Sequence, residues 1–120
     1  METLLRRKRW LRFAGSKVAR RKGASDRIAV NTICQGSAAD LVKAVMVDLA
    51  SHPSFCGPTP EARLVLQIHD ELLIEVRKES LHAVARTVAE IMSIGNRLRL
   101  SVDLPVKLHW GTTWACLQPL

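Results

Sequence analysis

Apolar and polar positions alternate in the last part of the chain. The even positions from 98 to 110 are all apolar: Leu98, Leu100, Val102, Leu104, Val106, Leu108 and Trp110. Each odd position between them is polar except Pro105. A period of two predicts a half-buried β-strand over at least part of this stretch. Because proline cannot donate a ladder hydrogen bond, Pro105 indicates an edge position or a break.

Two shorter apolar runs, 62–68 and 71–77, are separated only by His69 and Asp70. This spacing predicts two antiparallel strands that are joined by a tight hairpin turn. The turn and the residue that follows it, Glu71, then place an imidazole and two carboxylates at the rim of the sheet.

Helical spacing precedes this hairpin. A helix is expected to begin at Ser25 or Asp26, either of which can cap it, and to run to Ser51. Its second half has one apolar face, formed by Leu41, Val42, Val45, Met46 and Leu49. Gly36 and Ser37 predict a bend, because helix propensity is low there.

A second amphipathic helix is expected over 79–96 and should end near Gly95. The segment 52–60 contains three prolines and a glycine and is expected to be an exposed connection. These elements predict an α+β fold, in which a small antiparallel sheet has helices packed on one face. A chain of 120 residues is long enough for one such domain.

The net charge of +7 is concentrated at the amino terminus. Residues 1–23 hold nine of the 18 Lys and Arg but only Glu2 of the 11 acidic residues, so the remainder is near neutral. A basic arm over 1–25 favours a polyanion, such as nucleic-acid phosphates, as the partner. A solvated tail or an Arg-rich mitochondrial presequence would have the same composition. No stretch approaches the roughly 18 apolar residues of a membrane span, so a soluble intracellular chain with no membrane partner is expected.

Asp70, at a rigid hairpin tip, is a candidate ligand for a hard cation such as magnesium through its carboxylate oxygens. The sequence His69-Asp70-Glu71 taken alone is also typical of an ordinary turn. A metal phosphohydrolase with an adjacent His-Asp pair is a further interpretation, but such a site needs more histidines. The remaining histidines have no convergent spacing: His52, His82 and His109.

Arg27, Asn31 and Gln35 are spaced four residues apart on the first helix. This spacing puts their side chains in a row, with neighbours about 6 Å apart along the axis. All three can donate hydrogen bonds, and the minor groove of DNA offers an N3 or O2 acceptor at every base pair. Such a row could test base-pair geometry without reading sequence, although a solvated helix face is an equally good interpretation.

Two long motifs resemble the carboxy-terminal palm of family A DNA polymerases. They are "DRIAVNTICQGSAADLVKAVM" at 26–46 and "LVLQIHDELLIEV" at 64–76. Within the family, the theta and nu polymerases of animals are the most similar. In addition, "RRKRWL" at 6–11 resembles the basic segment after the fingers, and "LHWGTTWACL" at 108–117 resembles the closing strand. The resemblance therefore covers nearly the whole chain.

The resemblance implies a post-fingers segment over 1–25 and an incomplete palm subdomain over 26–120. It implies that Asp70 is a catalytic metal ligand, with Glu71 beside it and His69 near the primer terminus. The residues implied to contact DNA are Arg27, Asn31 and Gln35 at the primer–template duplex and Arg7, Lys8 and Arg9 along the nucleic-acid backbone.

The reaction implied for the parent enzyme is template-directed addition of deoxynucleoside triphosphates to a primer, with two magnesium ions. In the family, a second carboxylate comes from an earlier palm strand and a fingers helix binds the triphosphate, and neither is recognisable in this sequence. The metal site is then half present, and the chain is expected to be inactive without the fingers, the thumb and the first palm strand. A non-catalytic nucleic-acid-binding remnant is the alternative. A theta-like parent implies a nuclear location.

Overall fold

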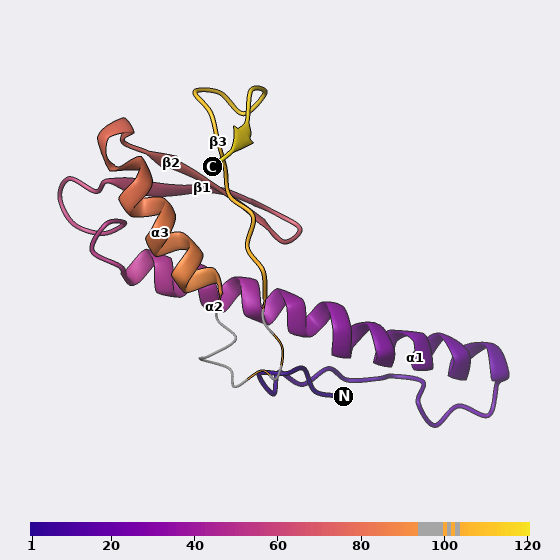
Figure 1. The fold of residues 1–120 in the computed structure, drawn as a ribbon. Coiled ribbons are helices and arrows are strands. Elements are labelled where there is room, and N and C mark those ends of the chain that lie inside the picture. The colour runs from indigo at the N-terminus through magenta and orange to yellow at the C-terminus, as the bar shows by residue number, and fades with distance from the viewer. Residues whose placement is uncertain (94–99, 101, 103) are drawn as a thin grey trace. The chain divides into compact units, whose positions relative to one another are not determined.

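A computed structural model describes residues 1–93, 100, 102 and 104–120 (Figure 1). These residues form two compact units, Met1–Ala44 and Val45–Leu120. The domain boundary predicted after residue 25 lies within the first unit. Among the described helices, none has both the length and the apolar character that crossing a membrane requires.

The first unit contains a continuous helical run. Helix α1 spans Ala19–Asn31, and the π-helical turn η1 spans Thr32–Gly36. Helix α2, Ser37–Ser51, follows directly and extends beyond this unit. At the position of the predicted bend, the backbone hydrogen bonds therefore change from the α-helical i→i−4 pattern to the π-helical i→i−5 pattern, and the helix continues.

The prediction that this helix begins at Ser25 or Asp26 is wrong. The residue before the first turn is Val18, and no side chain caps the helix there. Three residues of the first turn, Arg20, Arg21 and Lys22, have high helix propensity, so the helix extends over them and includes both predicted caps. Part of the basic arm is thus helical.

The second unit contains the predicted hairpin. Strand β1, Ala62–Ile68, pairs antiparallel with β2, Glu71–Val76, and the turn consists of His69 and Asp70. A β-bulge interrupts the register between Leu64 and Leu66. The hairpin prediction is therefore confirmed, with the second strand ending one residue earlier than predicted.

The bulge changes which face of the hairpin carries the apolar side chains of β1. Leu64 pairs with Ile74, whereas Leu66, two residues later, pairs with Leu73. Because neighbouring residues of β2 point to opposite faces, Leu64 and Leu66 also lie on opposite faces. Val65 and Leu66 are consequently exposed.

The described helices α2 and α3 pack against the hairpin. The buried core consists of Val45 and Leu49 from α2, Ala62 from β1, and Val84 and Val88 from α3. Helix α3 spans Leu81–Met92, follows the 3-10 turn η2 at Lys78–Ser80, and lies beside the hairpin in Figure 1. The side chains of β2 that pack against this core are Leu72, Ile74 and Val76. The fold class is α+β.

The segment 52–60 forms no helix or strand, as predicted, although Phe55 packs against the core and is not fully exposed. The helix predicted over 79–96 is present as η2 and α3, and its predicted end near Gly95 lies outside the described residues.

The strand predicted over 98–110 lies partly outside the described residues. Among those described, only His109–Trp110 forms a strand, β3, which pairs with β4, Gln118–Pro119. From 104 to 110 the even positions are still half-buried and the odd positions exposed. The alternation thus predicted which side chains are covered, but a ladder also needs a partner backbone, and Pro105 cannot donate to one.

Candidate nucleic-acid and metal site

The hairpin places His69, Asp70 and Glu71 at one tip, where all three side chains are exposed. His69 has a φ of 53°, in the left-handed region that two-residue hairpin turns use and that L-residues adopt at a cost. The Gln67 side-chain amide donates a hydrogen bond to the His69 carbonyl and so supports the turn.

The tip offers carboxylate oxygens to a ligand. Within the described part of the chain, the side chains of Asp70 and Glu71 make no hydrogen bond or ion pair. Both carboxylates are open to solvent. Exposed carboxylate oxygens match the ligand preference of magnesium.

The described residues do not provide a complete metal site. They contain no cluster of at least three His, Cys, Asp or Glu side chains that could hold a metal ion. The tip can therefore supply only part of a coordination shell. No further histidine joins His69 and Asp70 in such a cluster among the described residues.

The row Arg27, Asn31 and Gln35 lies on the helical run of the first unit, and all three side chains are exposed. None of them makes a hydrogen bond or ion pair with another described residue. Their donors are thus available to an external partner, as the nucleic-acid interpretation requires and as a solvated face also permits.

The π-helical turn changes how this row is aligned. Along an α-helix, each step of four residues overshoots a full turn by about 40°, so three such residues drift around the axis. In η1 the hydrogen bonds span five residues, and each residue turns through a smaller angle. The drift between Asn31 and Gln35 is reduced, which brings Gln35 back towards the line of Arg27 and Asn31.

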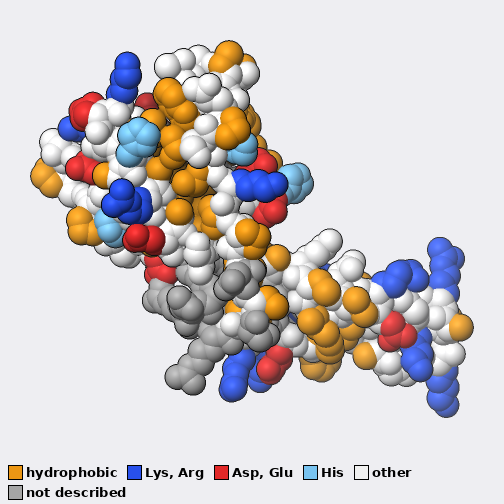
Figure 2. Space-filling model, viewed as in Figure 1, with side chains coloured by type: hydrophobic (Ala, Val, Ile, Leu, Met, Phe, Trp, Pro, Cys, Tyr) orange, Lys and Arg blue, Asp and Glu red, His pale blue; other side chains and the backbone are white. Residues whose placement is uncertain are grey.

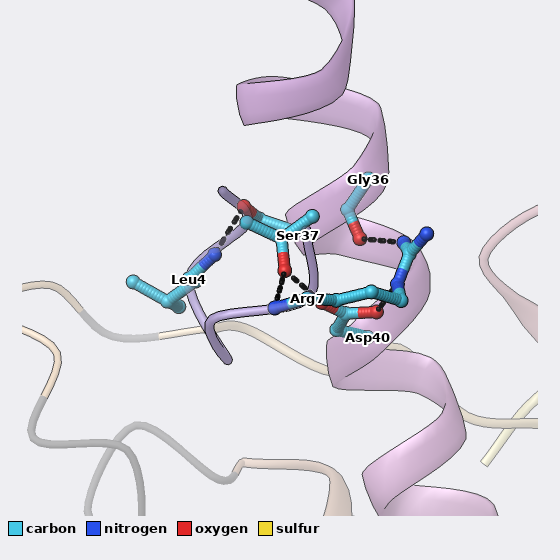
Figure 3. A network of polar contacts seen from close by, with 6 residues as sticks. Leu4, Arg7, Gly36, Ser37 and Asp40 are labelled. Atoms are coloured by element: carbon cyan, nitrogen blue, oxygen red, sulfur yellow. Dashed lines mark hydrogen bonds and ion pairs between the residues drawn. The ribbon is translucent and has the colours of Figure 1, made fainter. Parts of the chain in front are cut away.

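The amino-terminal strap, residues 1–9, is bound to the start of α2 (Figure 3). Arg7 Nε donates to Asp40 Oδ1 at 2.7 Å, and Arg7 Nη2 donates to the Gly36 carbonyl at 3.1 Å. The Thr3 hydroxyl donates to the other carboxylate oxygen of Asp40. The backbone N–H of Leu4 donates to Ser37 Oγ at 2.8 Å. The strap is therefore held by the backbone carbonyl of Gly36 in η1 and by the side chains of Ser37 and Asp40 in α2.

This contact requires a glycine at position 36. A Cβ there would lie 2.9 Å from Thr3 Cγ2 and 3.5 Å from Arg7 Nη2. Thr32, four residues before Gly36, also lies close, with its Cγ2 3.6 Å from such a Cβ. Thr32 is buried, and its hydroxyl donates to the Ile28 carbonyl at 2.7 Å. Gly36, which suggested only a bend in the sequence, thus permits close approach of the strap.

Asp40 is the buried charge of this cluster, with 6% of its surface exposed. The hydrogen bond from Thr3 holds the pKa of Asp40 below its ordinary value of 3.8, and the hydrogen bond and charge of Arg7 act in the same direction against the opposing effect of burial. The carboxylate is consequently ionised at neutral pH and keeps both partners.

Sequence reasoning missed Asp40 and Thr3. They are 37 residues apart, and no periodicity links positions at that separation. The same reasoning assigned Arg7, Lys8 and Arg9 alike to the nucleic-acid backbone. In the structure Arg7 forms an ion pair with Asp40, whereas Arg9 is exposed. Lys8 forms an exposed 3.8 Å ion pair with Glu2, and such surface pairs contribute little to stability.

The sequence of this chain is similar to those of known proteins. The model of DNA polymerase family A matches residues 1–116. DNA polymerase I of Bacillus caldotenax is 41% identical over 93% of this chain, and the thermostable DNA polymerase I of Thermus aquaticus is 39% identical over 95%. This chain spans only 12% and 13% of the lengths of these two relatives.

A solved structure is also similar. It is the POL domain of Pol1 from M. smegmatis in complex with DNA primer–template and dNTP, with a TM-score of 0.75 and 33% identity over 88% of this chain and 18% of that one. The relatives named here are bacterial, so the closer resemblance to the theta and nu polymerases stays a prediction.

Proposed function

Because this chain belongs to DNA polymerase family A, we propose that it contributes part of the palm of a DNA-directed DNA polymerase. The observation that carries the proposal is the hairpin tip, where a two-residue turn presents Asp70 and the adjacent Glu71 with no competing partner among the described residues. The reaction is template-directed transfer of deoxynucleotides to a primer, in replication or repair. A nuclear location is part of the proposal and follows from the theta-like motifs alone.

In this function Asp70 is the magnesium ligand that this chain provides, with Glu71 as an adjacent acid and His69 beside the primer end. When bound, magnesium supplies the Lewis-acid chemistry that nucleotidyl transfer needs. The described residues supply only part of its shell, so the remaining ligands must come from elsewhere in the polymerase. The fingers and thumb would bind the triphosphate and hold the duplex.

The row Arg27, Asn31 and Gln35 is proposed to contact the minor groove of the primer–template duplex. Its exposed donors and their alignment through η1 support this role. Acceptors at N3 and O2 occur at every base pair, so the row would sense pairing and remain indifferent to sequence.

Primer extension tests the catalytic half of the proposal. We expect the pure 120-residue chain to add no nucleotide to a primer–template with magnesium, because its ligand set is incomplete. Extension above background that is abolished by Asp70→Ala would contradict this expectation.

Duplex binding tests the other half. Arg27→Ala should weaken binding to blunt duplex DNA by about 1–3 kcal/mol, the range for a lost hydrogen bond from a charged group. Arg86→Ala, which removes an exposed arginine of α3, is the matched control. Equal affinities of the two variants at moderate salt would identify the row as a solvated face. DNA binding by this chain without any polymerase activity that depends on Asp70 would favour the non-catalytic alternative.

A further inference from the structure

A second row of residues lies beside the exposed row that contains Asn31 and Gln35. Thr32, Gly36 and Asp40 are also spaced four residues apart, and Thr32 and Gly36 directly follow Asn31 and Gln35 in the sequence. Successive residues of a helix point roughly a quarter of a turn apart, so the two rows occupy adjacent faces. Thr32 and Asp40 are buried. Contacts that hold the second row therefore also determine where Asn31 and Gln35 point.

The strap makes these contacts. Arg7 bridges two members of the second row, since its Nη2 donates to the Gly36 carbonyl at 3.1 Å and its Nε donates to Asp40 Oδ1 at 2.7 Å (Figure 3). Thr3 donates to the other carboxylate oxygen of Asp40. The planar fork of a guanidinium holds two acceptors in a fixed geometry, which the ammonium group of a lysine does not. The backbone directly after Gln35 is thus fixed to the strap.

The strap presents Arg7 from a closed turn. The backbone N–H of Thr3 donates to the Arg7 carbonyl at 3.0 Å, and the backbone N–H of Arg7 donates to the Thr3 hydroxyl at 3.1 Å. Between them, Arg6 has a φ of 62°, in the left-handed region that an L-residue adopts at a cost. Such a conformation persists only where the surrounding contacts offset its cost, and the bonds to Gly36 and Asp40 are contacts of this kind.

The segment that Arg7 holds is the π-helical turn η1. Turns of this type are rare and occur mostly as single turns inside α-helices. The turn ends at Gly36, whose carbonyl accepts the hydrogen bond from Arg7, and it sets the direction of Gln35. Loss of this hydrogen bond removes a support for the alignment of Gln35. Arg27 lies in α1, outside the turn, and does not depend on it.

We propose that Arg7, held by Asp40 and Thr3, is a positioning residue that keeps Gln35 aligned for its contact with the minor groove. The inference rests on the proposed function and adds to it a residue that acts through the helix and not by touching DNA. Its consequence is specific, because Gln35 should depend on Arg7 and Asp40 whereas Arg27 should not.

Asp40→Asn separates positioning from a simple effect of charge. The substitution removes a negative charge and releases the Arg7 guanidinium, so electrostatics alone would tighten binding to DNA. Positioning predicts the opposite: the affinity of the 120-residue chain for the blunt duplex should fall about fivefold, the contribution of one hydrogen bond from Gln35. Asp26→Asn makes the same charge change at an exposed position of α1 and should not weaken binding. Figure 2 shows Lys and Arg side chains gathered around the amino-terminal end of α1, and neither substitution alters them.

A double-mutant cycle identifies the residue through which Asp40 acts. Gln35→Ala should weaken binding to the blunt duplex about fivefold in the wild type but less than about 1.5-fold in Asp40→Asn, where Gln35 is already misaligned. Arg27→Ala should weaken binding by the same factor in both backgrounds. General unfolding would reduce both effects together, and circular dichroism checks the helix content. Arg7→Lys keeps the charge but not the guanidinium fork, so it should repeat the result of Asp40→Asn.

The inference is overturned if Asp40→Asn binds the blunt duplex as tightly as Asp26→Asn does, or if its effect and that of Gln35→Ala are additive. Tighter binding by Asp40→Asn than by Asp26→Asn would show that the released Arg7 contacts phosphate and would also overturn it. If Gln35→Ala and Arg27→Ala both weaken binding and Asp40→Asn changes neither effect, the proposed function stands and this inference alone fails. If neither substitution weakens binding in the wild type, the proposed duplex contact fails and this inference falls with it.

Discussion

Asp40 is expected to decide whether the amino-terminal strap stays on α2. Asp40→Asn keeps the side-chain volume but removes the charge that accepts hydrogen bonds from Arg7 and Thr3. A hydrogen bond to a charged group contributes about 1.5–3 kcal/mol net. Arg7 is 50% exposed, so solvent screens its share, and removing the carboxylate charge should cost about 2 kcal/mol in total.

That loss falls on the strap and not on the core, because the buried apolar cluster lies entirely in the other unit. The assay is hydrogen exchange at the amides of Thr3, Arg6 and Arg9, whose acceptors all lie within the strap. Their free energy of opening should fall by about 2 kcal/mol in Asp40→Asn, roughly a thirtyfold faster exchange.

The same contact makes the strap sensitive to acid. The pKa of Asp40 is lowered in the folded state, so its stabilisation is fully present above the ordinary value of 3.8. The stabilisation is lost as the pH falls through the lowered pKa, because protonation is then favoured in the opened strap. In Asp40→Asn this part of the pH dependence should disappear.

Asp26→Asn is the matched control, since it makes the same chemical change at an exposed position of α1. The reasoning is refuted if Asp40→Asn and Asp26→Asn leave the strap amides with the same opening free energy, within about 0.5 kcal/mol.

Two further predictions concern the strap and the hairpin. Lys8→Gln and Arg9→Gln should each reduce the magnitude of the slope of log K against log salt for duplex DNA by about 0.9. Arg7→Gln/Asp40→Asn should change this slope much less, because Arg7 is already bound to Asp40. Equal slopes for all three variants would show that Arg7 also contacts phosphate. His69→Gly should raise the free energy of unfolding by about 1 kcal/mol in denaturant titrations, because a glycine adopts the φ of 53° without strain. His69→Ala keeps a Cβ and should show no such gain, and a gain of equal size in His69→Ala would exclude backbone strain as the cause.

The candidate site was predictable from the sequence where it depends on neighbouring residues. The two-residue spacing between apolar runs gave the hairpin and put Asp70 at its tip, and the four-residue spacing gave the exposed row Arg27, Asn31 and Gln35. The motifs gave the family, and the family model now supports that assignment over residues 1–116.

The misses have physical causes. The helix start was placed at capping residues, but propensity continued α1 back to Ala19 without any cap. The strand predicted over at least part of 98–110 is present at His109–Trp110, and its length could not be predicted because alternation reports which side chains are covered and not whether a neighbouring backbone is available to pair. The assignment of Arg7, Lys8 and Arg9 to the nucleic-acid backbone stays a prediction, and the structure adds that Arg7 makes an internal ion pair with Asp40.

The sequence by itself determined the local elements, because backbone geometry fixes the period of each element and side-chain polarity reveals that period. Only the tertiary structure decided three features: the bulge that turns Leu66 away from the core, the π-helical turn that realigns Gln35, and the ion pair between Arg7 and Asp40. Each depends on atoms that a fold brings together from distant positions, such as the 33 residues between Arg7 and Asp40, and a local pattern carries no record of such contacts.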